Sequence, residues 1–291
     1  MKIKKQKQGQ DDHYGEPDLE KVIRFFETAA LKIGDIQVKN QKDAVLVGKG
    51  RNKDSVKDVV TSIDHQCQNV FIDMAIQQGL NLFRIRAEEN SGSLISFSRT
   101  SRYALVIDPI DGTSNYGNQK AEFGTSMGVL DLKELQFVAG LIYVPDMEAM
   151  FEAIKGKGAY KVDPSTMART PLRTKHKPLK KIHIGYQVSE DTEYRLSVDK
   201  IDSERPKCAV YSTACLLLGK TQAYYCNESK IWDIGPGSLI LQEAHGYSSV
   251  QRWNMGRKDV GYFIFAVSDE AGKDMRARLM RTTEISTLMK R

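Results

Sequence analysis

The stretch YALVIDPIDGTSNYG, residues 103–117, decides the fold. Its residues 104–107 form a short, continuous apolar run, which is typical of a strand buried on both faces. Pro109 predicts the end of this strand, because proline has no N–H to donate to a sheet ladder. We therefore expect a buried strand that carries Asp108 and Asp111 to its exposed end, where ligands bind in open α/β sheets.

The two aspartates of this stretch predict a metal site. Two carboxylates three residues apart are common, and without their context they would indicate a solvated loop. Hard oxygen ligands gathered at a strand end suit Mg²⁺ better than zinc or copper. Gly112 permits a tight turn. If Gly112 and Thr113 open a helix or an anion-binding nest, their amides would donate to a phosphate.

Three further acidic elements flank this stretch, and each has an alternative interpretation. Asp64 ends the segment DVVTSID and could instead cap the following helix. Glu88 and Glu89 follow an apolar segment, and a pair of glutamates usually forms surface salt bridges. Asp233 also fits a helix N-cap, with Pro236 tolerated in the first helical turn. None of the three elements indicates a site by itself.

The remaining hydrophobic periodicity predicts alternating helices and strands. A first helix opens at Pro17 and Asp18 and ends at Gly34, and a second runs from about residue 64 to 78. Further strands are expected at 123–130, 137–144, 149–154, 182–187, 223–225 and 263–267. Further helices are expected at 209–219, from 233 to 246, and after a cap at 268 or 269. This alternation predicts a layered α/β or α+β architecture.

The composition indicates an ordinary globular chain. Its 291 residues, 41% of them hydrophobic, are enough for one large core or two joined subdomains. It contains no apolar run near the roughly 20 residues of a membrane span. Its polar N-terminus lacks a secretory signal, so a cytoplasmic location is expected. The four cysteines have no zinc-site or disulfide-framework spacing and predict free thiols.

The net charge of +6 lies partly in two segments. Residues 1–16 predict a flexible basic arm, because lysines crowd the first seven positions. Residues 169–181 carry a second basic run, which predicts a solvated loop or a general attraction for an anionic substrate. Neither segment has the aromatic interleaving or the motif of a nucleic-acid surface. Nucleic acid is therefore not the expected partner, although such binding is left open.

In chain order, the segments VVTSID, EEN, DPIDGT, KGKGAY and WD…EAHG resemble the signature blocks of the inositol monophosphatase family. The resemblance spans about residues 53–246. It implies an α+β fold, the layered α-β-α-β-α sandwich of sugar phosphatases. Residues 17–291 would form one phosphatase domain, whose two tightly joined subdomains meet near 160–180. The resemblance also implies hydrolysis of a small phosphate monoester, two to three Mg²⁺ per active site, inhibition by lithium and a homodimer.

The resemblance assigns metal ligands to individual positions. The first Mg²⁺ would be bound by Glu88, Asp108 and the carbonyl oxygen of Ile110. The second would be bound by Asp108, Asp111 and Asp233. A third and weaker Mg²⁺ would lie near Glu88 and Asp111. Two cations about 3.5–4 Å apart can bind both the attacking and the leaving oxygen of a phosphoryl transfer.

Catalytic and substrate-binding roles follow from the same resemblance. Thr113, supported by Asp64, would orient and deprotonate the attacking water, and Glu88 is counted with them as catalytic. Lys53 matches a lysine of a mobile loop that approaches the metals in relatives. The residues that would contact the substrate are Asp111, Gly112, Thr113, Ala209, Asp233, Lys207 and Cys226.

The chain departs from the family pattern in the substrate pocket. Cys226 stands where relatives that act on inositol phosphates carry a glutamate, and a thiol is a poor acceptor for sugar hydroxyls. Lys207 and Cys208 stand where small residues are usual, and Lys207 would either meet a second phosphate or be exposed. The alternatives are a phosphatase specific for fructose 1,6-bisphosphate or 3′-phosphoadenosine 5′-phosphate, or a regulatory member of the fold that binds RNA or protein.

Overall fold

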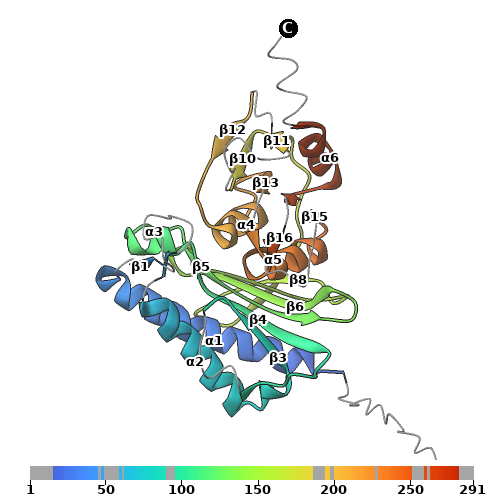
Figure 1. Cartoon of the computed structure of the whole chain (residues 1–291). Helices are drawn as coiled ribbons and strands as arrows, with labels where there is room; N and C mark the ends of the chain where they lie inside the picture. The colour runs from blue at the N-terminus through green and yellow to red at the C-terminus, as the bar shows by residue number, and fades with distance from the viewer. Residues whose placement is uncertain are drawn as a thin grey trace, which may run out of the picture.

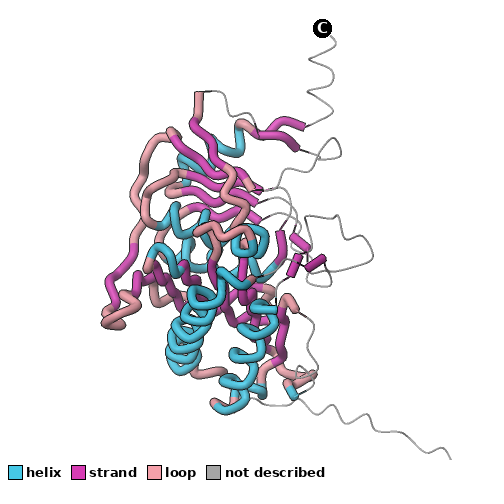
Figure 2. Tube along the Cα trace, turned by 90° about the vertical axis from the view of Figure 1, so that its left-hand side faces the viewer, coloured by secondary structure: helices cyan, strands magenta, loops and turns pink. Residues whose placement is uncertain are grey.

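The computed structural model describes residues 16–44, 47–48, 59–60, 62–89, 96–185, 194–196, 200–226, 229–250, 259–260 and 263–281. Within these ranges the chain builds two principal sheets, with helices between them and on their outer faces (Figures 1 and 2). The predicted basic arm falls almost wholly on residues outside this description.

The larger β layer is a seven-stranded sheet in the order β3-β4-β5-β6-β7-β8-β9. β3 runs parallel to β4, and each later neighbour is antiparallel. The strands are β3 (Arg84–Ala87), β4 (Tyr103–Asp111), β5 (Gly124–Asp131), β6 (Gln136–Val144), β7 (Ala149–Ile154), β8 (Ala159–Val162) and β9 (Arg169–Leu172).

The second β layer is a five-stranded sheet in the order β12-β10-β13-β17-β15. β12 and β13 run parallel to the β10 strand between them, whereas β17 is antiparallel to both of its neighbours. The strands are β10 (Lys181–Ile184), β12 (Asp202–Glu204), β13 (Ala223–Cys226), β15 (Tyr247–Val250) and β17 (Phe263–Ala266). The chain therefore crosses from the first sheet to the second between residues 172 and 181.

Helices complete five layers, seen edge-on in Figure 1. α1 and α2 pack on the outer face of the larger sheet, α4 and α5 lie between the sheets, and α6 packs on β13, β15 and β17. The helices are α1 (Leu19–Asn40), α2 (Ser62–Gln77), α3 (Thr113–Gly117), α4 (Ala209–Leu217), α5 (Ile231–Glu243) and α6 (Asp269–Ala277). This is the predicted α-β-α-β-α sandwich.

Short elements connect these layers. Single 3₁₀ turns occur at η1 (Gln41–Asp43), η2 (Leu80–Leu82) and η4 (Pro145–Met147). Three two-stranded pairs are β1 (Val47–Gly48) with β2 (Val59–Val60), β11 (Tyr194–Leu196) with β18 (Leu279–Arg281), and β14 (Ser229–Lys230) with β16 (Asp259–Val260). None of the helices in the described ranges is long and apolar enough to cross a membrane.

The first helix is longer than the sequence pattern predicts. α1 continues past Gly34 to Asn40, so Gly34 does not end it. Gly34 is instead a site of close packing, because a Cβ built there would lie 2.5 Å from Cε1 of Tyr143 on β6. The helix gains a further polar contact where the buried Gln37 side chain donates to the Pro109 carbonyl over 2.7 Å.

The strand that carries the two aspartates continues through Pro109 to Asp111, contrary to the expected stop. The register against β5 shifts between Asp108 and Asp111, which marks a bulge. A proline is tolerated at a bulge because its missing N–H interrupts no ladder bond there. The Pro109 carbonyl is held by the Thr125 hydroxyl at 3.0 Å, so the irregular backbone remains bonded.

The helix after the Trp-Asp dipeptide also begins earlier than predicted. α5 starts at Ile231, and Lys230 is its N-cap residue, so Asp233 lies inside the first turn. Pro236 therefore falls beyond the first turn, inside the helix. It packs closely against the sheet, since a Cβ at Gly140 would lie 2.9 Å from the Pro236 carbonyl oxygen.

The other predicted elements are confirmed with boundary shifts of a few residues. The four cysteines are free and buried, as predicted. The basic run at 169–181 is only partly a solvated loop, because Arg169 belongs to β9. Its guanidinium lies 3.0 Å from Glu27 and 2.9 Å from Glu152.

Candidate active site

Asp108 lies at the bulge of β4 and is 2% exposed. Its Oδ1 accepts from the backbone N–H of Ile110 at 3.0 Å, which turns the carboxylate back over the chain. Opposite Asp108 in the register stands Ser126 of β5, which is also buried. A carboxylate at this depth is costly to ionise unless an opposite charge is close.

Asp111, the last residue of β4, is held by the N-terminus of α4. Its Oδ2 accepts from the Val210 backbone N–H at 2.5 Å and lies 3.2 Å from the Cys208 sulfur. α4 follows β4 by about a hundred residues in the chain, so the two halves of the sandwich meet at this carboxylate. The positive end of the α4 dipole also favours a negative charge here.

Gly112 and Thr113 connect β4 to α3. Gly112 adopts a left-handed conformation with φ of 85° and precedes the first residue of α3, Thr113. The Thr113 hydroxyl lies 3.2 Å from Asp64 Oδ1 and 2.9 Å from the Ile110 carbonyl oxygen. Asp64 is fully buried inside the first turn of α2, so it is not the cap of that helix. The hydroxyl–carboxylate pair is therefore formed by two separate elements.

Glu88 and Glu89 follow β3 directly. Because Ala87 pairs with Ile107 in the parallel β3–β4 ladder, Glu88 emerges beside Asp108, and its N–H donates to the Ile107 carbonyl at 3.3 Å. Glu89 is 4% exposed, and its backbone exchanges two hydrogen bonds with the side chain of Gln68 on α2. The surface salt-bridge interpretation is therefore wrong for Glu89.

Asp233 enters the site from α5. Its Oδ2 accepts from the Lys230 backbone N–H at 2.9 Å and from the Ser229 hydroxyl at 2.8 Å. The first turn of α5 thus fixes the Asp233 carboxylate, which interacts with the charges of Asp111 and Glu88.

The electrostatics of these groups join them into one cluster, called here the carboxylate cluster: Glu88, Asp108, Asp111 and Asp233. Burial, and then the charges of its three neighbours, raises the pKa of Asp108 well above its usual value. Burial also raises the pKa of Asp111 to about 6, against the hydrogen bonds from Val210 and Cys208. Burial and the charges of Asp111 and Glu88 raise the pKa of Asp233 to about 8. One buried and three half-buried acids that repel one another are best stabilised by cations.

The donor set fits a hard divalent cation, since it consists of carboxylate oxygens and an adjacent backbone carbonyl. In the parts of the chain described here, however, no three His, Cys, Asp or Glu side chains already close around one point as metal ligands. Rotation of the carboxylates is therefore required for several of them to bind one ion.

The predicted pocket residues divide into buried and exposed groups. Ala209 is buried at the start of α4, and Cys226 is buried at the end of β13. A Cβ at Gly185 would lie 2.6 Å from the Cys226 sulfur, so the thiol fills the space beside the β10 terminus. Lys207 is exposed, with a left-handed φ of 58°. Lys53 lies outside the described residues.

Sequence reasoning missed the groups that hold the carboxylates in place. The Val210 amide and the Ser229 hydroxyl are the clearest examples. A backbone amide has no sequence signal, and Ser229 lies four residues before Asp233, whereas a capping box has a spacing of three.

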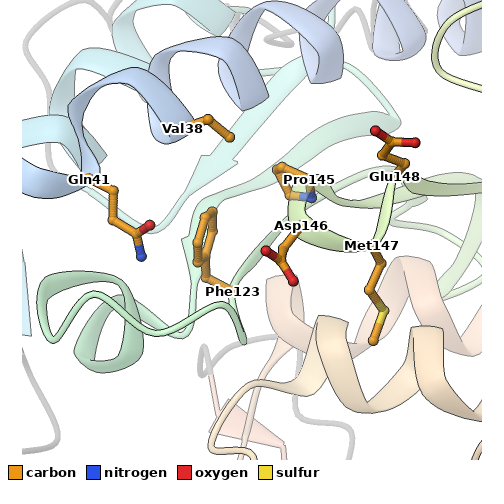
Figure 3. A pocket seen from close by; sticks show the side chains of 7 residues that line it. All are labelled: Val38, Gln41, Phe123, Pro145, Asp146, Met147 and Glu148. Carbon is orange, nitrogen blue, oxygen red and sulfur yellow. The ribbon is translucent and has the colours of Figure 1, made fainter.

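Figure 3 shows a separate surface pocket of about 430 Å³. It is bounded by the end of α1, the start of β5 and the turn between β6 and β7. None of the predicted site residues lines it; its lining residues are Val38, Gln41, Phe123, Pro145, Asp146, Met147 and Glu148.

Residues 18–281 match the model of the inositol monophosphatase family. The chain belongs to this family. It is 30% identical over 210 residues to the inositol-1-monophosphatase of Bacillus subtilis, a match that covers 68% of this chain and 75% of the relative. The chain is thus a phosphoric monoester hydrolase of the inositol monophosphatase type.

The chain is also similar to proteins with other names. The chain is 29% identical over 238 residues to Nus factor SuhB of Escherichia coli, covering 76% of this chain and 82% of that protein. Among solved structures, the extragenic suppressor protein suhB of Bartonella henselae superposes with a TM-score of 0.72. That superposition covers 89% of this chain and 98% of the other at 20% identity, which shows the shared fold.

Proposed function

We propose that this inositol monophosphatase family member is a Mg²⁺-dependent phosphatase that acts on a small polyol or sugar phosphate through the carboxylate cluster. The proposal is supported by the convergence of four acidic side chains at the ends of β3 and β4 and the start of α5, of which Asp108 is buried and Glu88, Asp111 and Asp233 are half-buried. Burial and the charges of its neighbours raise the pKa of Asp108 and of Asp233, and burial raises that of Asp111. Such a cluster has little stability as an isolated fourfold anion, and a dianionic substrate would be repelled by it.

Glu88, Asp108, Asp111 and Asp233, with the Ile110 carbonyl, are the residues that would hold Mg²⁺. Bound Mg²⁺ would neutralise the phosphate and lower the pKa of a coordinated water. We propose two to three Mg²⁺ ions per active site, the number that the family resemblance implies.

Thr113 and Asp64 would position the attacking water and accept its proton. The Thr113 hydroxyl, in contact with Asp64, would accept a hydrogen bond from the attacking water and pass its own proton toward the Asp64 carboxylate. The Gly112 and Thr113 amides would bind the phosphoryl oxygens at the start of α3. In-line attack by water would then break the phosphorus–ester oxygen bond without a covalent enzyme intermediate.

The alcohol part of the substrate would face Asp111, Asp233, Ala209 and Cys226. Cys226 offers no charged acceptor for ring hydroxyls, which weakens the case for inositol monophosphate itself. Lys207 is exposed, so it is free to meet a second phosphate of a bisphosphorylated sugar or nucleotide.

The test is inorganic phosphate release from a panel of phosphate monoesters with and without Mg²⁺. The panel contains inositol monophosphates, simple polyol phosphates, fructose 1,6-bisphosphate and 3′-phosphoadenosine 5′-phosphate. We expect Mg²⁺-dependent release from at least one member. A preference for a bisphosphate that is lost in Lys207→Ala would favour the bisphosphatase alternative, whereas an unchanged preference would assign the choice to other residues.

A second candidate function is binding of RNA or a protein partner, favoured by the similarity to Nus factor SuhB and by four exposed cations between β9 and β10. These are Arg173, Lys175, Lys177 and Lys180. Replacing all four with glutamine should abolish a salt-sensitive RNA shift while leaving phosphatase activity intact. A wild-type chain that gives no shift at low salt would remove this candidate.

We also propose that this chain forms a homodimer, as the family resemblance implies. Sedimentation equilibrium measures it directly, and a single species of monomer mass across the micromolar range would reject it.

A further inference from the structure

Cys208 is the side chain through which α4 contacts the end of β4. Its sulfur lies 3.2 Å from Asp111 Oδ2 and 3.4 Å from the Asp111 carbonyl oxygen. The Tyr211 backbone N–H donates to the same sulfur over 3.3 Å. Since a carboxylate and a carbonyl accept only, the single thiol hydrogen must point toward Asp111, while Tyr211 occupies a lone pair of the sulfur.

The position of this thiol is fixed from several sides. Cys208 is the N-cap residue of α4, with φ of −147°, and is 3% exposed. Its side chain also occupies the space beside Gly112, because a Cβ there would lie 3.0 Å from Cys208 Cβ and 3.3 Å from its sulfur. Because Gly112 has no Cβ, it leaves room for the sulfur next to the carboxylate.

The Asp111 carboxylate has little freedom to rotate once it is bonded to the Val210 N–H and the Cys208 thiol. The Val210 N–H and the Cys208 thiol both address Oδ2, from the same helix end. Groups that bond a carboxylate ligand from behind set its rotation, and replacing them typically costs about 10- to 100-fold in metal affinity or activity.

We propose that Cys208 is a positioning residue for Asp111, which it holds in one orientation through an S–H···O hydrogen bond while capping α4. The inference rests on the proposed function, because Asp111 is there a Mg²⁺ ligand. It assigns a role in the reaction to a cysteine that stands where small residues are usual in the family.

Two variants separate this role from simple packing. Cys208→Ala removes the donor and the helix cap, whereas Cys208→Ser keeps both with a shorter reach. We expect Cys208→Ala to raise the Mg²⁺ concentration for half-maximal activity about 10-fold and to lower kcat, with KM for the phosphate ester changed less than twofold. Cys208→Ser should recover at least half of the loss. Equal losses in both variants would contradict the proposal.

A spectroscopic readout tests the hydrogen bond without any activity. The S–H stretching band of Cys208 is obtained as the infrared difference between wild type and Cys208→Ser, recorded without Mg²⁺. We expect a band at the lower frequency of a hydrogen-bonded thiol, which moves to higher frequency when the same difference is taken in an Asp111→Ala background. A band that does not move would overturn the assignment.

Mg²⁺ binding gives a readout that is independent of the substrate. Trp232 is buried next to Asp233, so its fluorescence should respond when Mg²⁺ binds. The titration midpoint should rise in Cys208→Ala and return toward wild type in Cys208→Ser. If wild type binds Mg²⁺ but hydrolyses no ester, the proposed function fails while this comparison still decides the role of Cys208. An unchanged midpoint in Cys208→Ala rejects that role.

Discussion

The hydroxyl of Thr113 lies 3.2 Å from Oδ1 of Asp64, a residue 49 positions earlier in the chain. The first belongs to α3, beyond β4, and the second to the first turn of α2. Both side chains are largely buried, so neither has bulk water as an alternative partner. A hydroxyl backed by a buried carboxylate is suited to remove a proton from a neighbouring water.

Replacement of either member of this pair should lower kcat with little effect on Mg²⁺ affinity. A general base typically contributes about 10²- to 10⁴-fold to the rate. We therefore expect Thr113→Ala and Asp64→Asn each to lower kcat by a factor in that range. Because both residues act on the same proton, the kcat of the double variant should be only slightly lower than that of either single variant. Steady-state phosphate release at saturating Mg²⁺ measures this. Multiplicative losses would show that the two residues act separately.

Lithium should inhibit the Mg²⁺-dependent activity at millimolar concentration. The expectation follows from the family resemblance, in which Li⁺ replaces a Mg²⁺ bound near Asp111 and Asp233. Phosphate release measured over a LiCl series, with NaCl at equal ionic strength as control, decides it. Activity that is equal in both salts would count against the assignment of the second Mg²⁺ site.

The buried charges that join α1 to the larger sheet should make stability depend on pH. Burial, and then the charge of Glu27, raises the pKa of Glu152 to about 8, although Arg169 opposes the shift. Because the folded pKa is raised, this group's stabilising contribution is complete below the unfolded pKa near 4.5 and is lost as pH rises through 8. The free energy of unfolding should therefore fall by up to about 1.4 kcal/mol per pH unit in this window.

Glu152→Gln is the matched test of that dependence. The amide cannot ionise, so the variant should unfold with a smaller pH dependence between pH 5 and 8 and should be the more stable protein at pH 8.5. Glu27 is retained and still pairs with Arg169 at 3.0 Å. Urea unfolding at several pH values gives the free energies. Parallel pH profiles for the two proteins would be inconsistent with a raised pKa at Glu152.

Gly34 should respond to alanine in the direction opposite to an ordinary helical glycine. In an exposed helix interior, glycine to alanine stabilises by about 1 kcal/mol. At Gly34 the new Cβ would lie 2.5 Å from Tyr143 Cε1, so either α1 or the buried Tyr143 ring must shift. We expect Gly34→Ala to lower the free energy of unfolding by about 1–3 kcal/mol. A gain in stability would mean that the Tyr143 ring shifts aside at no cost.

The sequence was most informative where function is encoded in contiguous residues. The apolar run before Asp108 predicted a buried strand, and the order of the acidic segments predicted the family. Local patterns failed where packing between distant elements decides the structure. Gly34 does not end its helix as the local pattern predicts, because its contact with Tyr143 lies outside that pattern. Pro109 does not end its strand, because the bulge there depends on Thr125 and Gln37.

The candidate site was predictable in its acidic groups but not in their supports. Asp111 is oriented by residues about a hundred positions away, and the Val210 contact uses a backbone amide, for which no residue type is required. In the sequence Cys208 is only a departure from the family pattern, because its contact with Asp111 exists only once the fold brings α4 to the end of β4.

Asp108 carries the central claim, because it is the buried carboxylate on which the charges of Glu88, Asp111 and Asp233 all act. The most direct test is phosphate release by wild type and by Asp108→Asn over a Mg²⁺ titration, with thermal unfolding to show that both proteins are folded. We expect activity in wild type that requires Mg²⁺ and that falls by at least about 10³-fold in the variant. Activity that persists in Asp108→Asn, or that does not depend on Mg²⁺, would contradict it.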